Sequence, residues 1–247
     1  MEHQKSIAKS NKLNMCNFKN YTKMDYLFFL FLLSKVKRYD EFGNLIANAQ
    51  VTKITITAQE FAETFSIDIS NAYEVLKVST LSLQSKPIQF RDLFETDTNW
   101  TLITESSFYK SGYAEIYFNA KICHHVANLA EKFTRYKLTS ISKLDTLPAI
   151  RLFELLIQWK KSGEYIDTLE NIKFSLDKES YSEYKIFKRD VLIPAITELN
   201  LKNKRLNVQF IEKKESRKVS EIQFIFNPNP KKPKPIVVKP LQPERDF

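Results

Sequence analysis

The chain has 247 residues, 43% of them hydrophobic and 13% aromatic, with 38 Lys and Arg against 29 Asp and Glu. This apolar content suffices for a hydrophobic core and excludes a chain that is disordered throughout, while the length suits one large domain or two smaller ones. The net charge of +9 favours a polyanionic partner, three glycines are too few for Gly-rich phosphate loops, and two cysteines exclude a disulfide framework or a cysteine-based zinc site.

The N-terminal part contains one strongly apolar run, at residues 26–33. Eight residues are far fewer than the roughly 20 that cross a bilayer, and Lys35, Lys37 and Arg38 follow where a signal peptide would have a cleavage site. We therefore expect a buried helix here, after a flexible N-terminus at residues 1–10, in a soluble cytoplasmic protein with reduced thiols.

The next elements of the first half are two helices and two strands. Thr57 and Glu60 form a capping-box pattern ahead of a short helix that ends at Phe65. A turn at residues 66–68 leads to a second helix, at about residues 71–83, and residues 100–103 and 113–118 alternate as strands do.

The second half opens with a long helix. Asp145 or Thr146 caps it, Pro148 lies in its first turn, and Gly163 stands where a C-terminal cap belongs. The apolar positions form one face of this helix, which places Arg151 and Glu154 on other sides.

The remaining elements repeat the order of the first half. Asp167 and Glu170 open a short helix that ends near Phe174, and Ser180 with Glu183 starts a longer helix that runs to about residue 200. Strands at residues 206–210 and 221–226 enclose a charged hairpin at 212–218, and the tetrads at residues 65–68 and 174–177 nearly match. Each half thus has the element order of a winged helix.

These patterns predict an α+β protein of two tandem winged-helix domains with a pseudo-repeat. The predicted parts are a flexible N-terminus at 1–10, a first domain at 11–130 for dimerisation or DNA contact, a second, DNA-reading domain at 131–226 and a disordered Pro/Lys-rich tail at 227–247. Residues 1–130, 131–226 and 227–247 have net charges of +1, +5 and +3. The basic excess therefore lies in the second half and the tail, which also holds six of the nine prolines.

The longer helix of the second half is the strongest candidate for a DNA-reading element. Its apolar positions leave basic and polar side chains on the opposite face, and a helix in this place in a helix–turn–helix enters the major groove. The predicted contacts of the second half are Tyr181, Ser182, Lys185, Lys188 and Arg189 on the helix and Lys213, Lys214, Arg217 and Lys218 on the wing. The equivalent helix of the first half offers Ser70, Asn71, Tyr73 and Lys77 with much less charge.

Catalytic and metal sites receive no support from the sequence. Two of the three histidines, His124 and His125, are neighbours after Cys123, a spacing that suits neither a metal site nor a His-x-His nicking enzyme. The carboxylates form no metal-binding cluster. We expect no cofactor, no metal and no enzymatic activity.

Three segments of the second half resemble a known family, the iteron-binding, theta-type plasmid replication initiators with two winged-helix domains. The segments are residues 133–144, the Arg151-Leu152-Phe153-Glu154-Leu155-Leu156 block, and residues 184–200 from Tyr184 to Asn200. The resemblance extends over residues 10–226, and in the first half it depends on element order.

This resemblance implies a function and partners. Such initiators bind origin repeats as monomers, help to melt an adjacent AT-rich element, and recruit the host initiator and the replicative helicase. As dimers, formed largely through the first winged helix, many repress their own gene. Two alternatives remain: a winged-helix repressor without an initiation role, and a basic protein-interaction module that uses its strands and tail.

Overall fold

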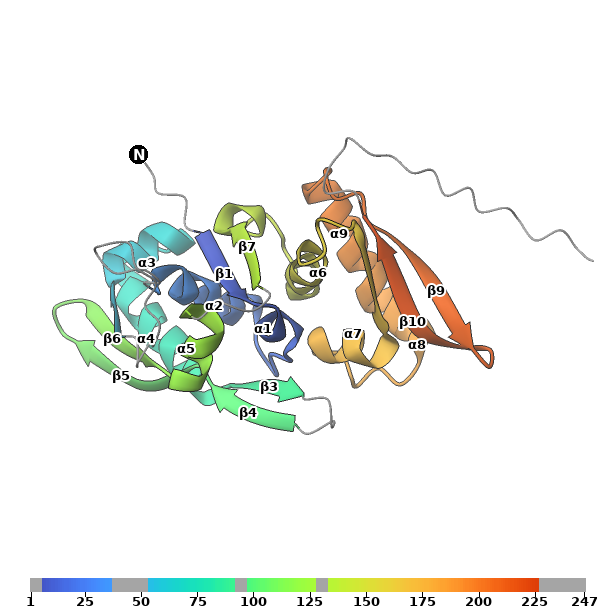
Figure 1. Cartoon of the computed structure of the whole chain (residues 1–247). Helices are drawn as coiled ribbons and strands as arrows, with labels where there is room; N and C mark the ends of the chain where they lie inside the picture. Colours follow the sequence, from blue (N-terminus) through green and yellow to red (C-terminus); the bar gives the residue numbers. More distant parts are fainter. Residues whose placement is uncertain (1–5, 37–52, 92–96, 128–132, 227–247) are drawn as a thin grey trace, which may run out of the picture.

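The computed structural model describes residues 6–36, 53–91, 97–127 and 133–226, which form two units joined by α6 (Leu147–Ile157) (Figure 1). Each unit contains a strand, a helix–turn–helix and a hairpin, and the strand pairs with the second strand of the hairpin. The two sheets, β2-β6-β5 and β8-β10-β9, therefore share one topology and are antiparallel throughout. This shared topology confirms the predicted pair of winged helices. The predicted disordered tail and residues 1–5 lie outside the described residues.

The first winged helix follows the sequence pattern closely. Its elements are α2 (Lys23–Lys35), β2 (Lys53–Thr57), α3 (Ala58–Phe65), α4 (Ile69–Ser85), β5 (Ile103–Tyr109) and β6 (Tyr113–Phe118). The apolar run is the buried helix α2, and Thr57 caps α3 by accepting a 3.1 Å hydrogen bond from the Glu60 amide. The predicted strand at 100–103 is wrong, because those residues cover the end of β4 (Asp97–Thr101) and the start of β5.

The second winged helix has a longer turn and a longer hairpin than predicted. It consists of β8 (Glu164–Thr168), α7 (Leu169–Ser175), α8 (Tyr184–Phe187), a π-helical turn (Lys188–Leu192), α9 (Ile193–Lys202), β9 (Gln209–Glu215) and β10 (Lys218–Ile225). Thr168, rather than Asp167, caps α7, and Thr146 caps α6 with Pro148 in its first turn. Gly163 is not the cap of α6, since it takes φ 75° in the turn that follows the helix.

The matching tetrads occupy different conformations in the two units. In the first, Ser66 is left-handed (φ 54°) and Asp68 caps α4 directly. In the second, Ser175 is still helical, Asp177 is the left-handed residue (φ 55°), and the helix begins only at Tyr184. The tetrads are thus similar in sequence without sharing a structural role.

Several elements lie outside the two winged helices. They are β1 (Ser6–Ser10), α1 (Asn11–Met15), β3 (Pro87–Arg91), β4, α5 (Ala120–Ala127), β7 (Phe133–Lys137) and a 3-10 turn (Leu138–Ser140). β1 pairs with β7 along its whole length, and Ile7, Ala8 and Lys9 are fully buried. The prediction of a flexible segment is therefore wrong for residues 6–10. The β1–β7 ladder also joins two segments that the predicted domain boundary at residue 130 would separate.

A buried polar network lies between these segments. The Lys9 ammonium is 2.8 Å from a carboxylate oxygen of Glu154 and donates a 2.8 Å hydrogen bond to the Tyr26 hydroxyl. Arg151 bonds the other carboxylate oxygen of Glu154 at 2.9 Å, and the hydroxyls of Tyr26 and Tyr136 donate to the same carboxylate. Burial would raise the pKa of Glu154, but Lys9 and Arg151 hold it below its ordinary value. The prediction that Arg151 and Glu154 lie away from the core is wrong, because both are buried in it.

Arg151 also connects the two units. Its guanidinium donates to the carbonyls of Asn14 (2.6 Å) and Cys16 (2.8 Å) in the first unit and of Ser175 (3.2 Å), the last residue of α7, in the second. The hydroxyl of Ser175 donates back to the carbonyl of Met15 at 3.0 Å. The end of α7, which leads toward the candidate reading helix, is therefore fixed to the first unit.

Candidate nucleic-acid interface

The candidate reading helix is continuous from Tyr184 to Lys202, with a π-helical turn in its middle. Phe187, Val191 and Leu199 are buried against the rest of the unit, whereas Lys185 and Arg189 are exposed. These two residues are four apart, so their side chains lie about one helical turn from each other on the outer face. The side chain of Arg189 is 73% exposed, and its guanidinium donates hydrogen bonds of 2.5 and 2.9 Å to the Asp190 carboxylate. The sequence therefore correctly predicts that these two cations lie on an open helix face.

The wing is the hairpin β9–β10, whose strands pair up to Glu215 and Lys218. Ser216 and Arg217 make the two-residue turn with φ values of 46° and 72°, the positive pair that a type I′ hairpin turn requires. Lys213, Lys214, Arg217 and Lys218 are all exposed around this end of the hairpin. The predicted basic wing is thus present, although its three lysines belong to the strands and only Arg217 to the turn.

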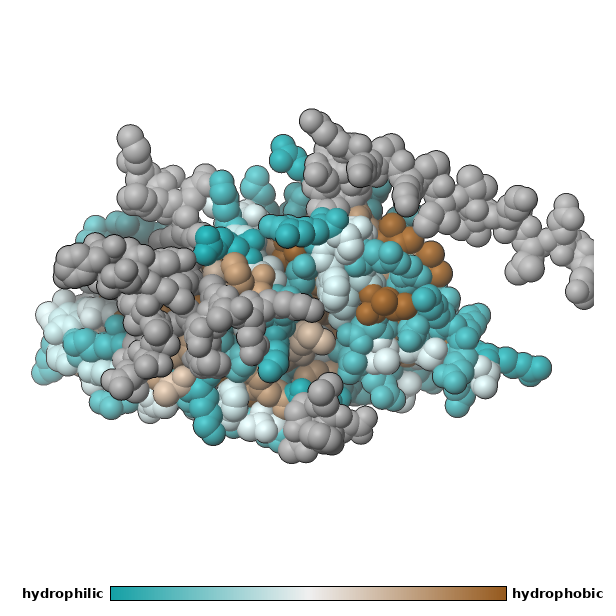
Figure 2. All heavy atoms as spheres, in the orientation of Figure 1, coloured by the Kyte–Doolittle hydropathy of each residue, from teal (hydrophilic) through white to brown (hydrophobic). Residues whose placement is uncertain are grey.

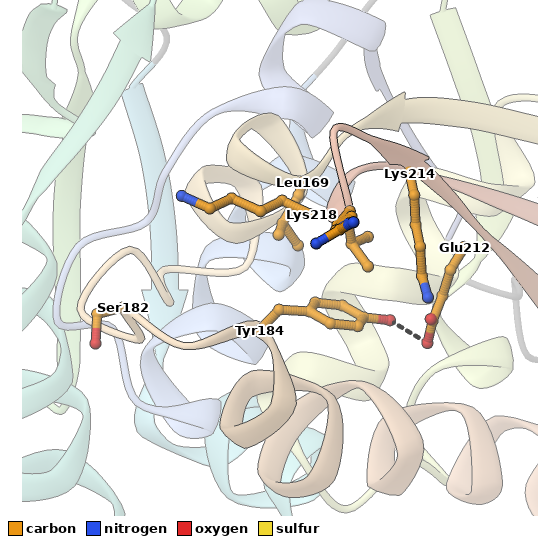
Figure 3. Close-up of a pocket in the computed structure, with 8 residues that line it drawn as sticks. Leu169, Ser182, Tyr184, Glu212, Lys214 and Lys218 are labelled. Atoms are coloured by element: carbon orange, nitrogen blue, oxygen red, sulfur yellow. Dashed lines mark hydrogen bonds between the residues drawn. The ribbon is translucent and has the colours of Figure 1, made fainter.

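A groove of about 480 Å³ lies between the start of the reading helix and the wing (Figure 3). Lys214, Arg217 and Lys218 line it together with Tyr184 and Glu212. Figure 3 shows the Tyr184 ring reaching across the groove, where its hydroxyl donates to Glu212 at 2.8 Å. Three cations against one carboxylate leave the groove positively charged, which suits a phosphate oxyanion.

Glu212 also holds the wing to the reading helix. Its carboxylate accepts a 2.6 Å hydrogen bond from Lys188, and this bond lowers the pKa of Glu212 and keeps it ionised. The Lys188 ammonium lies 5.4 Å from the centre of the Phe210 ring. Lys188 therefore packs against the wing, and its predicted place among the outward-facing residues is wrong.

Two further residues of the second unit are not on the helix at all. Tyr181 and Ser182 precede it, because the helix starts at Tyr184 with Glu183 at the cap position. The Tyr181 ring packs edge-on against Phe187 at 6.2 Å, and its carbonyl accepts a hydrogen bond from Lys173. Ser182 is exposed and lines the groove. It therefore stays a candidate DNA contact, but from the loop before the helix and not from the helix itself.

The equivalent helix of the first unit, α4, presents a different surface. Ser70 and Asn71 are exposed in its first turn, with the Ser70 hydroxyl bonded to Asp68 at 2.6 Å. Tyr73 is half-buried against a cluster of alanines, and the Lys77 ammonium lies 6.0 Å from the Phe108 ring centre. The outer face beyond them carries Glu74, Val78 and Leu81. The four predicted residues are therefore not gathered into one basic surface.

Comparison with known families agrees with this geometry. The model "Initiator Replication protein, WH1" matches residues 6–157, and "Initiator Rep protein, WH2" matches residues 168–226. The chain belongs to this replication initiator family. The resemblance drawn from the sequence is confirmed, and the first match extends past the boundary predicted at residue 130.

Two relatives that this chain resembles come from Escherichia coli. The PI protein is 32% identical over 133 residues, which are 47% of this chain and 44% of the relative. A replication initiation protein is 25% identical over 177 residues, 69% of this chain and 55% of the relative. The chain thus aligns with about half the length of these relatives. The crystal structure of the Pi initiator protein in complex with iteron DNA superposes with a TM-score of 0.69 at 23% identity, covering 92% of this chain and 98% of that one, and so shares its fold.

The surface of the chain that Figure 2 shows has separate hydrophilic and apolar regions. Figure 2 shows a hydrophilic wing tip and a brown, apolar patch over the sheet β8-β10-β9. Ile166 and Ile211 are 41% and 39% exposed there, on either side of Gln223. The apolar patch is therefore distinct from the end of the wing, where Lys213, Lys214, Arg217 and Lys218 are exposed.

The described residues hold no cluster of three or more His, Cys, Asp or Glu side chains that could bind a metal ion. Within the same ranges, no helix has both the length and the apolarity to cross a membrane. His125 lies in the helix α5, and its ring stacks on those of Phe90 and Trp100 with centroid distances of 5.1 and 5.9 Å.

Two residues of the interface escaped the sequence reasoning. Tyr184 falls on the apolar stripe by its spacing, which hides that its hydroxyl reaches the groove. Glu212 appears as one charge in a charged hairpin, although it is the acceptor that joins wing and helix. Only the alternation of strand β9, which points Glu212 inward with Phe210, could have indicated this role.

Proposed function

We propose that this protein binds repeated double-stranded DNA sites at a plasmid origin through its second winged helix and thereby starts replication. The observation that carries the proposal is the positive groove between the reading helix and the wing, with Lys185 and Arg189 exposed on the outer helix face. A helix of this kind reads base edges in the major groove, and a basic wing binds the phosphate backbone. Membership in the replication initiator family and the fold shared with an initiator crystallised on iteron DNA support the same function.

The proposal assigns different roles to the helix and the wing. Arg189 is the best candidate for reading a base, because its side chain is 73% exposed and its guanidinium bonds Asp190, the next residue in the chain. Lys214 and Lys218 line the groove and are candidates for phosphate contacts. Catalysis has no part in this function, which consists of binding and of presenting the bound origin to other proteins.

The test uses the direct repeats upstream of the gene, or a duplex selected by the wild-type chain from a random-sequence library. We expect affinity to fall linearly in a log–log plot against salt, with a slope of about −0.9 per neutralised phosphate. Arg189→Ala should weaken binding about tenfold and relax the preference at one base position, since a bidentate guanidinium–base contact is lost. Lys214→Ala should weaken all duplexes alike and reduce the salt slope by about one.

Equal loss on every sequence for Arg189→Ala would assign that residue to the backbone. A wild-type chain with no preference for any duplex and a flat salt response would contradict the proposal and favour the protein-interaction alternative. In that alternative, a protein partner would bind the outer face of the sheet, where Ile166 and Ile211 are exposed.

The finer parts of the proposal concern partners and regulation. We infer that the monomer binds the origin repeats in the bacterial cytoplasm and recruits the host initiator and the replicative helicase. A dimer, formed mainly by the first unit, represses the gene. A plasmid that carries the gene and its upstream repeats should replicate only with the gene intact. Repression without replication would instead identify a dedicated repressor.

A further inference from the structure

The loop between α7 and the reading helix, residues 176–183, is bound by the first unit through two of its carboxylates. The Asp177 carboxylate accepts a 3.1 Å hydrogen bond from the Asn20 amide. The Glu179 carboxylate accepts one from the Asn17 side-chain amide at 3.3 Å and one from the Arg91 guanidinium at 3.1 Å. These three donors come from segments far from the loop in sequence, so the first unit contacts the turn of the second unit's helix–turn–helix.

Arg91 comes from an element that a winged helix does not require, the hairpin β3–β4. Figure 1 shows this hairpin reaching from the first unit to a position below α7. Its strand β3 is tied to the first unit by two backbone hydrogen bonds between Gln89 and Asn17, at 2.9 and 2.8 Å. Asp97, on β4, orients the Arg91 guanidinium through a 3.0 Å hydrogen bond.

The Arg91 guanidinium contacts both the helix before loop 176–183 and the middle of that loop. Its central carbon lies 4.0 Å from the ring centre of Phe174, in the last turn of α7, while its NH2 group bonds Glu179. A loop of this length would sample many conformations if it were free, and ordering it on DNA would reduce affinity. Contacts made before binding remove that cost.

We propose that the hairpin β3–β4 acts as a strut for the second unit, with Arg91 as a positioning residue that fixes loop 176–183 and thereby the start of the reading helix at Tyr184. The inference rests on the proposed function and adds that the first unit supports DNA reading by the second. Charge neutralisation alone is the competing explanation, since Arg91 also offsets a carboxylate beside a DNA-binding surface.

A double-mutant cycle on the full chain separates the two explanations. The variants are Arg91→Ala, Glu179→Ala and the double variant, and the probe is the duplex selected by the wild-type chain. If the pair positions the loop, each single variant lowers affinity by about three- to fivefold and the double variant is no weaker than the weaker single variant. If only charge matters, Arg91→Ala weakens binding, Glu179→Ala strengthens it and the effects add, which would overturn the proposal.

Two matched variants sharpen the result. Arg91→Lys keeps the charge but loses the planar group that both stacks on Phe174 and bonds Glu179, so a strut predicts a loss close to that of Arg91→Ala. Asp97→Asn removes a carboxylate partner of Arg91 within the first unit and leaves the Glu179 contact available, so its effect should be the smallest. Wild-type affinity of Arg91→Lys for the duplex would contradict the role of the hairpin as a strut.

Hydrogen exchange without DNA tests the strut independently of the function. Arg91→Ala should speed amide exchange in residues 176–187 while the core strands of the second sheet keep their protection. Unchanged exchange in that loop overturns the strut even if the chain binds DNA. A wild-type chain that binds no duplex would instead contradict the proposed function. The exchange measurement would then still test whether Arg91 fixes loop 176–183.

Discussion

Arg151 is the residue on which the connection between the two units depends most. Its guanidinium bonds Glu154, Tyr26 and three backbone carbonyls, and only 2% of the residue is exposed. A buried ion pair does not by itself add stability, because its desolvation cost is comparable to its attraction. Removing one partner does lower stability, because the other charged and polar groups then stay buried without a partner.

We therefore expect Arg151→Ala to lower the free energy of unfolding by about 3–5 kcal/mol. Arg151→Lys should have a smaller effect, because an ammonium keeps the charge near Glu154 but cannot reach all the carbonyls. Urea denaturation followed by circular dichroism measures both, with Arg135→Ala on the exposed face of β7 as the control. An Arg151→Ala chain with the wild-type midpoint would show that the network is dispensable.

The same residues show where sequence reasoning loses its power. Helical periodicity assigns Arg151 and Glu154 to solvent because charged side chains are rarely buried. Their burial depends on Lys9 and Tyr26, more than 120 residues away in sequence from Glu154, and on carbonyls that no pattern can place. Local signals such as Thr57 and Pro148 were predictable because a cap and a first-turn proline act within four residues.

At the scale of elements, the reading helix shows how one proline shapes the interface. Pro194 has no amide hydrogen and its ring would meet the carbonyl four residues earlier, so an unbroken α-helix is strained there. The chain passes through the π turn Lys188–Leu192 immediately before it. A proline at this position indicates a kink or restart of the helix but does not specify a π turn, which rotates Lys185 and Arg189 relative to the buried residues of α9.

We expect Pro194→Ala to allow a regular α-helix and so to turn the outer face away from its present direction. Affinity for the selected duplex should fall about tenfold, the size of one lost side-chain–base contact, while thermal stability stays the same or rises. Pro148→Ala is the control, because this proline lies at the start of α6 where its missing amide costs no ladder bond. Unchanged DNA affinity of Pro194→Ala would show that the π turn does not set the reading face.

For the whole molecule, the order of the elements was enough to predict two winged helices, but it did not predict where the boundary between the two units lies. Charge falls into regions that meet at residue 130, but charge reports on partners and not on packing. The β1–β7 ladder and the network around Glu154 join the N-terminal strand to segments beyond that point. A ladder between distant strands depends on edges that become available only in the folded chain.

This arrangement predicts which N-terminal fragment can fold. A fragment of residues 1–130 lacks β7 and α6, so Ile7 and Ala8 lose their strand partner and the buried Lys9 loses Glu154. A fragment of residues 1–163 keeps both. It loses the packing of α6 against α9 with the hydrogen bonds that Thr146 donates to Glu198, the Arg151 and Met15 contacts to Ser175, and the contacts of Arg91 and of loop 176–183. We expect the longer fragment to melt cooperatively, somewhat below the full chain, and the shorter one to show no cooperative transition by circular dichroism. Cooperative melting of the 1–130 fragment at the temperature of the 1–163 fragment would mean that β7 and α6 contribute nothing to the first unit.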